Sequence, residues 1–124
     1  MNSKNTNNNA FLIHISAFAG YFFPMGGIIA PVIFWQVKKD ESEYLDAQGK
    51  EAVNFNLSFA LYAFILGLSI IPLILGVPSF FGIFGGISLL VILEIIRFVL
   101  IILAAVKANN GEFYNYPLTI KFIK

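Results

Sequence analysis

Two oppositely charged residues, Glu94 and Arg97, lie near the middle of a long apolar block, residues 80–106. Inside a bilayer each isolated charge would cost about 2.5–3.5 kcal/mol on insertion scales, so such residues need partners. Their spacing of three puts both on one helix face and predicts a local ion pair. The alternative is a polar site that faces a wet crevice or a partner protein. His14, the only histidine, is the candidate third member of this intramembrane polar site.

A second polar pattern leads into the preceding apolar block, residues 52–75. Its side chains follow one another at spacings of three and four, which places them on one helical stripe: Gln48, Glu51, Asn54, Ser58 and Tyr62. An ordinary transition from water to lipid, with bonds to neighbouring backbone, explains the stripe. A strip that lines a cavity or a partner groove is the alternative.

Catalytic chemistry finds no support in the pattern. The sequence has one histidine, no cysteine, no His-Glu-x-x-His zinc pattern, no nucleophile elbow and no phosphate loop. We therefore predict a protein that is not an enzyme, with no catalytic residues, no metal site and no cofactor. A net charge of +1 also argues against a nucleic-acid partner, which would require a basic face.

The composition determines which class of fold must position these residues. Of the 124 residues, 58% are hydrophobic and 12% are charged, whereas soluble domains have about 25% charged residues. This predicts an all-α, polytopic membrane helix bundle in which three apolar blocks form about four helices. The lipid bilayer is the first expected partner.

The first apolar block, residues 10–37, is interrupted at Pro24 to Gly27 and again at Pro31. Each limb has roughly 12 residues and would measure about 18 Å, less than the roughly 30 Å of a bilayer core. We therefore favour one kinked traverse over a hairpin of two short limbs. The hairpin stays open, and with it the side of the membrane on which the N-terminus lies.

The second and third blocks are separated by an uncharged turn at residues 76–79, which predicts an antiparallel hairpin. Small residues four apart favour close helix packing. Such pairs are Gly82 with Gly86 in the third block and Ala63 with Gly67 in the second. The pattern leaves open whether the packing lies within one chain or between chains.

We expect three regions along the chain. Residues 1–9 are a disordered polar tail, residues 10–110 are the transmembrane domain with a charged loop at 38–50, and residues 111–124 are an aromatic and basic segment at the membrane surface. Lysines flank the blocks in the loop and after the third block. The positive-inside rule then places both regions in the cytoplasm of a multi-pass protein of the bacterial inner membrane.

Three stretches together resemble a known family of small bacterial membrane proteins, catalogued as a domain of unknown function. They are His14 with residues 31–35 and 38–40, then residues 46–55, and finally 107–108 with 111–112 and 116–118. That family is similar to the membrane subunit of the chloroplast inner-envelope import machinery, often called Tic-twenty-like. The resemblance implies an all-helical bundle of about four helices.

Two functions are compatible with these observations. The first is an accessory or channel-like subunit of a membrane transport or translocation assembly, which would use the stripe and the Glu94–Arg97 pair as a polar surface. The second is a membrane-protective or regulatory protein, acting in envelope stress or immunity to membrane-active peptides by binding a partner or lipid. A membrane protein partner or a homo-oligomer would fit either function.

Overall fold

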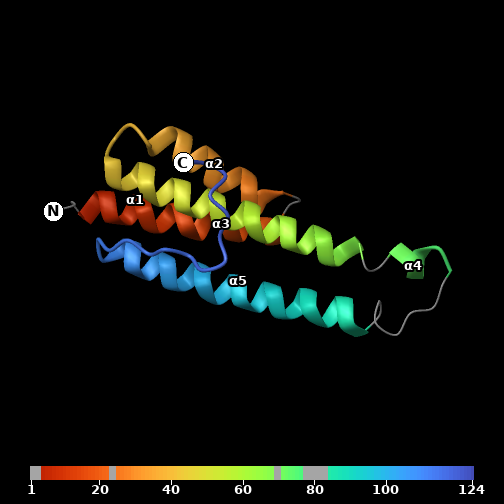
Figure 1. The fold of residues 1–124 in the computed structure, drawn as a ribbon. Helices are drawn as coiled ribbons and strands as arrows, with labels where there is room; N and C mark the ends of the chain where they lie inside the picture. Colours follow the sequence, from red (N-terminus) through yellow and green to blue (C-terminus); the bar gives the residue numbers. More distant parts are fainter. Residues whose placement is uncertain (1–3, 23–24, 69–70, 77–83) are drawn as a thin grey trace.

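The computed structural model describes residues 4–22, 25–68, 71–76 and 84–124, and every regular element in these ranges is helical. Two long helices run side by side, and a shorter pair packs on one end of them (Figure 1). The elements are α1 (Lys4–Ile15), the 3₁₀ helix η1 (Ser16–Tyr21), α2 (Gly26–Lys38), α3 (Glu43–Gly67), α4 (Ile71–Ile74) and α5 (Gly86–Asn109). The prediction of an all-helical fold is confirmed.

The charged stretch 38–50 is mostly helix, so the predicted loop is wrong beyond its first few residues. Ser42 caps α3, and its side chain accepts a hydrogen bond from the backbone N–H of Leu45 at 3.0 Å. Glu43 and Asp46 then lie in the first turn, where carboxylates stabilise the positive end of the helix dipole. The true connection between α2 and α3 is therefore a short turn around residues 39–42.

The helix predicted over residues 52–75 ends early. α3 stops at Gly67, and the one-turn helix α4 follows. Gly76, with φ of +84°, starts the predicted turn at 76–79, whose other residues lie outside the described ranges. Gly82 also lies outside them.

The first apolar block folds as a hairpin, so the single kinked traverse is wrong. The observed break lies between Tyr21 and Gly26 and overlaps the predicted one at Pro24 to Gly27, but Gly26 and Gly27 already belong to α2 and Pro24 is outside the described residues. η1 and α2 then pack against each other, and a Cβ on Gly20 would lie 3.0 Å from the Gly27 nitrogen. Two glycines facing each other allow this close backbone approach, which larger side chains would prevent.

Pro31 does not break α2, contrary to our prediction. Pro31 is the sixth residue of the helix. The first N–H groups of any helix have no partner within it, so the missing N–H of Pro31 costs α2 only one further backbone hydrogen bond. Its ring is buried. Packing therefore compensates for the lost bond.

The polar tail is shorter than predicted, because α1 begins at Lys4. Residues 4–9 continue the helix that buries Ala10 and Ile13 against α3 and α5. Asn7 also lies against Gly111 just beyond α5. Tertiary packing thus orders a segment whose composition alone predicts disorder.

α5 is the one helix in the described ranges that is long and apolar enough to cross a membrane, with a mean hydropathy of 2.9 in its most apolar window. Its 24 residues would measure about 36 Å. Its predicted end at Asn110 and Gly111 is confirmed: Gly111 has φ of +80°, and the Glu112 N–H donates to the Lys107 carbonyl at 2.9 Å. The polytopic arrangement stays a prediction.

The core lies at the end of the bundle where all four longer helices meet. One cluster joins Phe55 and Phe59 of α3 to Ile101 and Ala104 of α5, with Tyr116 of the C-terminal segment stacked on Phe55 at 3.8 Å between ring centroids. Beyond the hairpin, α3 and α5 continue without α1 or α2 beside them (Figure 1). The hairpin tip, by which we mean residues 20–22 and 25–28, therefore lies part-way along these two helices.

Candidate functional site

Glu94 and Arg97 form the ion pair that their spacing predicts, with Arg97 Nη1 2.8 Å from Glu94 Oε1. Their exposures differ: the Arg97 side chain is 13% exposed and that of Glu94 46%. The guanidinium therefore points into the bundle while the carboxylate lies at its edge. Whether the pair is a functional site stays a prediction.

Arg97 also binds two elements that sequence spacing could not connect to it. Its Nε donates to Asn56 Oδ1 of α3 at 3.1 Å, and its Nη2 donates to the backbone carbonyl of Ala17 in η1 at 3.0 Å. All three guanidinium nitrogens are thus used, each toward a different element. Arg97 is the residue that fastens the hairpin tip to α3 and α5.

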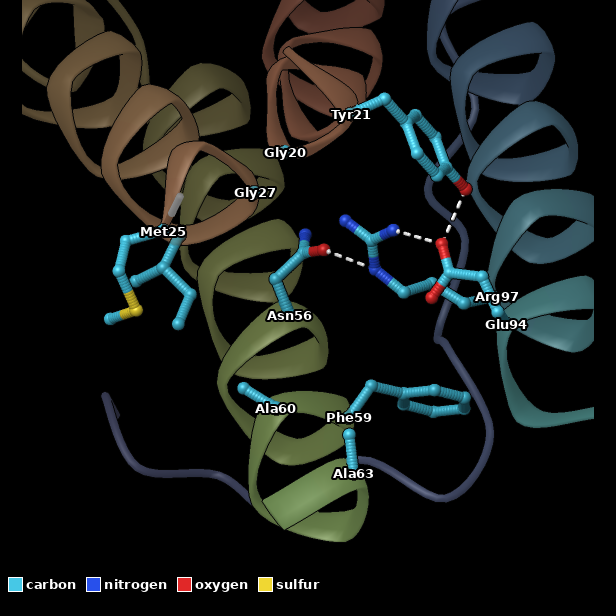
Figure 2. A pocket seen from close by; sticks show the side chains of 11 residues that line it. Gly20, Tyr21, Met25, Gly27, Asn56, Phe59, Ala60, Ala63, Glu94 and Arg97 are labelled. Carbon is cyan, nitrogen blue, oxygen red and sulfur yellow. Dashed lines mark hydrogen bonds and ion pairs between the residues drawn. The ribbon is translucent and has the colours of Figure 1, made fainter. Parts of the chain in front are cut away.

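Close approach of the α2 backbone makes this arrangement possible. A Cβ on Gly27 would lie 2.7 Å from Arg97 Nη2. On the other side, the hydroxyl of Tyr21 donates to Glu94 Oε1, the oxygen that also accepts from Arg97 (Figure 2). Sequence analysis missed Tyr21 and Asn56. Asn56 could have been predicted as a site residue from the sequence. Its amide lies in an apolar block and outside the stripe from Gln48 to Tyr62, so it needs a hydrogen-bond partner inside the protein.

These residues form the polar wall of a cavity of about 320 Å³ at the hairpin tip. Arg97 lies between Asn56 and Glu94, and apolar side chains complete the lining (Figure 2). The apolar part comes from the tip and from α3: Gly20, Met25, Gly27, Ile28, Phe59, Ala60 and Ala63. This volume is at the lower end of the range for small-molecule sites.

His14 does not join Glu94 and Arg97, so the predicted third member of the site is wrong. It is buried against α3 and the C-terminal segment. Gln48 Nε2 donates to the Glu112 carbonyl at 3.0 Å, which turns its Oε1 toward His14 Nε2 at 2.6 Å. The proton therefore sits on Nε2, and His14 Nδ1 accepts from the Tyr116 hydroxyl at 2.8 Å. His14 is a neutral, fully bonded core residue.

The predicted stripe on α3 binds the chain's own C-terminal segment, residues 111–124. Glu51 accepts the Tyr116 N–H at 2.8 Å, and the Tyr62 hydroxyl donates to the Leu118 carbonyl at 2.6 Å. Leu118 has φ of +59°, and the segment turns back there. The stripe therefore binds the backbone of this segment through hydrogen bonds.

The returning half of the segment uses the remaining stripe residues. Ser58 Oγ accepts the Ile120 N–H at 2.7 Å, and Asn54 bonds both backbone groups of Ile123. The Lys121 ammonium forms an ion pair with Glu51 Oε2. Each of the two interpretations of the stripe is therefore partly met. Its side chains bond backbone groups, as in the first interpretation, but this backbone belongs to a segment that is distant in sequence and fills a partner's place, as in the second.

The residues predicted to pack helices have mixed surroundings. Gly86 is buried at the start of α5, and Ala63 lines the cavity. Among the described residues, none lies within 4 Å of a Cβ placed on Gly67. Close packing through Ala63 and Gly67, within this chain or between chains, stays a prediction. In the described ranges no group of three or more His, Cys, Asp or Glu side chains could hold one metal ion.

Comparison with known protein families gives a match over nearly the whole chain. Residues 5–123 match the MamF/MmsF magnetosome magnetite crystal formation protein family. The chain belongs to this family. No curated protein and no solved structure matches it.

Family membership corrects two of our predictions. The resemblance to the unknown-function family and the Tic-twenty-like subunit is wrong, because the match assigns residues 5–123 elsewhere. The predicted transport or translocation subunit is wrong for the same reason, and the protective or regulatory alternative finds no support. The motifs we used, a basic turn before an amphipathic helix entry and a Gly-capped last helix, describe membrane-helix boundaries and so carried little information about activity. Membrane localisation is supported by the family.

Proposed function

We propose that this protein acts in magnetite crystal formation as an integral, non-enzymatic component of the magnetosome membrane. The observation that carries the proposal is the family match over nearly the whole chain, residues 5–123. The apolar surface of α5 supports the membrane part of it: most of the helix between Ile87 and Val106 is exposed and uncharged. Such a surface is stable against lipid and would aggregate in water.

Within the membrane, we propose that α3 and α5 both cross and that the α1–α2 hairpin enters only half-way. α2 has 13 residues and would measure about 20 Å, too short for a crossing. Backbone that departs from the α-helix is tolerated at membrane depth only where protein covers it. The bond from Arg97 to the Ala17 carbonyl supplies such cover for η1, the 3₁₀ part of the hairpin.

The same arrangement puts the charged ends of the protein on one side. Lys38 and Lys39 lie where α2 ends, and Lys107 lies in the last turn of α5. These two helix ends are at the same end of the bundle (Figure 1). By the positive-inside rule this end faces the cytoplasm. The N-terminus of the hairpin would then also lie on the cytoplasmic side, and exposed surfaces there could bind another membrane protein or a second copy.

Deleting the gene in its native host tests the role. We expect fewer or smaller magnetite crystals by electron microscopy, restored by the intact gene carrying an N-terminal tag, since a C-terminal tag would disturb the docked segment. The tag also shows that the protein is present in purified magnetosome membranes. Unchanged crystal number and size in the deletion strain would contradict the proposal.

Single cysteines test the topology, because the natural chain has none. With a membrane-impermeant maleimide, Ser42→Cys should be labelled only from the cytoplasm and Leu75→Cys only from the opposite side. Met25→Cys, at the hairpin tip, should be labelled from neither side although its side chain is 62% exposed in the protein. Labelling of Ser42→Cys and Leu75→Cys from the same side would rule out crossing by α3.

A further inference from the structure

The cavity at the hairpin tip has a polar wall whose charges cancel. Arg97 and Glu94 are its only charged lining residues among those described, and they are paired at 2.8 Å. A charged ligand would leave one charge uncompensated among apolar walls, which costs several kcal/mol. The site therefore favours a neutral occupant.

The polar wall nevertheless keeps unused hydrogen-bonding capacity of both kinds. A guanidinium has five N–H bonds, and the described contacts use three, one on each nitrogen. Both contacts to Glu94 end on Oε1, and its Oε2 makes none of the described bonds. The wall can therefore donate from Arg97 and accept at Glu94 side by side, which matches a hydroxyl group that both accepts and donates.

The rest of the cavity fits an apolar body. Phe59, Ala60 and Ala63 line it along α3, and Met25 and Ile28 line it from the hairpin (Figure 2). Small side chains at positions 60 and 63 leave room beside the helix. Phe64 of α3, next to Ala63, is an exposed apolar residue, so a molecule dissolved in the bilayer can approach the cavity along an apolar surface.

We propose that this cavity binds a neutral, membrane-soluble molecule with a hydroxyl head, the hydroxyl bonded to Arg97 and Glu94 and the apolar body lying along α3. Hydroxyl lipids and quinols share this chemistry. Filling by water is the competing state, since 320 Å³ would hold roughly ten water molecules. An apolar body that displaces poorly ordered water from apolar walls gains affinity. The inference does not depend on the role in crystal formation.

Photolabelling of the full chain in phosphatidylcholine vesicles tests the proposal. The probe is hexadecanol with a diazirine near its hydroxyl, and two matched probes carry a phosphate or a trimethylammonium head on the same chain. We expect the alcohol to label Met25 and Phe59 at least threefold more strongly than the lipid-facing Leu89, and excess unlabelled hexadecanol to remove this preference. The charged probes should not label Met25 and Phe59 preferentially.

Two matched variants locate the site. Ala63→Phe should fill the cavity and abolish preferential labelling, whereas Leu89→Phe, at a residue 51% exposed on α5, should leave it unchanged. Competition on the unaltered protein keeps the test valid if Ala63→Phe folds poorly. To compare the two possible sources, a short-chain quinol and a diacylglycerol serve as competitors, and the stronger one identifies the source. Labelling that follows exposure alone, resists competition or is equal for charged heads would overturn the proposal.

Discussion

Asn54 and Ile123 are joined by two hydrogen bonds. Asn54 Nδ2 donates to the Ile123 carbonyl at 2.9 Å, and the Ile123 N–H donates to Asn54 Oδ1 at 2.8 Å. A side-chain amide has one donor and one acceptor side, so it can bind an extended residue as a neighbouring strand would. The last residues of the chain are thereby fixed to a helix that lies about seventy residues earlier in the sequence.

Asn54→Ala should release this end of the chain. Both backbone groups of Ile123 would lose their partner, and we expect a loss of about 1–3 kcal/mol in the free energy of unfolding. Carboxypeptidase digestion in detergent micelles should become much faster, while Asn109→Ala, at an exposed position at the end of α5, should digest like the natural protein. Equal digestion of both variants would show that the docked segment is not held by Asn54.

The ion pair between Glu51 and Lys121 should behave asymmetrically. The Glu51 side chain is 4% exposed and that of Lys121 50%, so removing the lysine leaves a buried carboxylate with less compensation. We expect Lys121→Met to destabilise by about 1–3 kcal/mol and Glu51→Gln with Lys121→Met to recover part of that loss. Thermal unfolding of the single and double variants measures the coupling. Strictly additive changes would mean that the pair contributes nothing by itself.

Two glycines of α3 provide a matched comparison. A Cβ on Gly49 would overlap Trp35 Cδ1, whereas a Cβ on Gly67 would meet none of the described residues within 4 Å. Gly49→Ala should therefore displace the indole, lower the thermal midpoint and shift the emission of the single tryptophan. The expected cost is about 1–3 kcal/mol, as for other overpacked sites. Gly67→Ala should be neutral or stabilising by up to about 1 kcal/mol, because alanine favours helix.

Asp46 should make the contact between α2 and α3 sensitive to acid. The Trp35 indole N–H, which donates to Asp46 at 2.8 Å, lowers the pKa of Asp46 below its ordinary 3.8, with help from Lys50. Because the folded pKa is the lower one, this stabilisation is present above pH 3.8 and is lost as the pH falls through the folded pKa. Trp35 emission should follow that loss, and Asp46→Asn should remove the transition. An unchanged acid titration in Asp46→Asn would contradict the assignment.

Local patterns in the sequence predicted the parts of the fold that local chemistry decides. Helical spacing predicted the Glu94–Arg97 pair and the stripe from Gln48 to Tyr62, and Gly111 predicted the end of α5. Length arguments failed for the first block. We assumed that every apolar segment crosses the bilayer. A short hairpin can instead enter the bilayer only part-way if a residue such as Arg97 bonds its backbone.

The partners of those patterns depended on contacts distant in sequence. The sequence spacing does not connect Arg97 to Asn56 or Ala17. The C-terminal segment passes α3 twice because it turns at Leu118, and no glycine at that position predicts the turn. His14 was assigned to the nearest unexplained charges, although Gln48 and Tyr116 satisfy both of its ring nitrogens. The activity could not be predicted for a further reason. The residues on which the family resemblance was based mark the ends of membrane helices, and unrelated helical membrane proteins share such residues.

Arg97 should matter more to the fold than Glu94, and this follows from the number of elements that each one joins. Arg97→Leu removes the bonds to Asn56 and Ala17 along with the ion pair, whereas Glu94→Gln keeps an acceptor for Tyr21 and Arg97. We expect Arg97→Leu to lower the unfolding free energy by at least about 2 kcal/mol and Glu94→Gln by about half of that. Combining Glu94→Ala with Arg97→Leu should leave the protein about as unstable as Arg97→Leu alone, because the bonds to Asn56 and Ala17 stay lost. Thermal unfolding and protease cleavage at the hairpin tip measure both effects. Full recovery in the double variant would show that the ion pair is purely local and that the hairpin does not depend on Arg97.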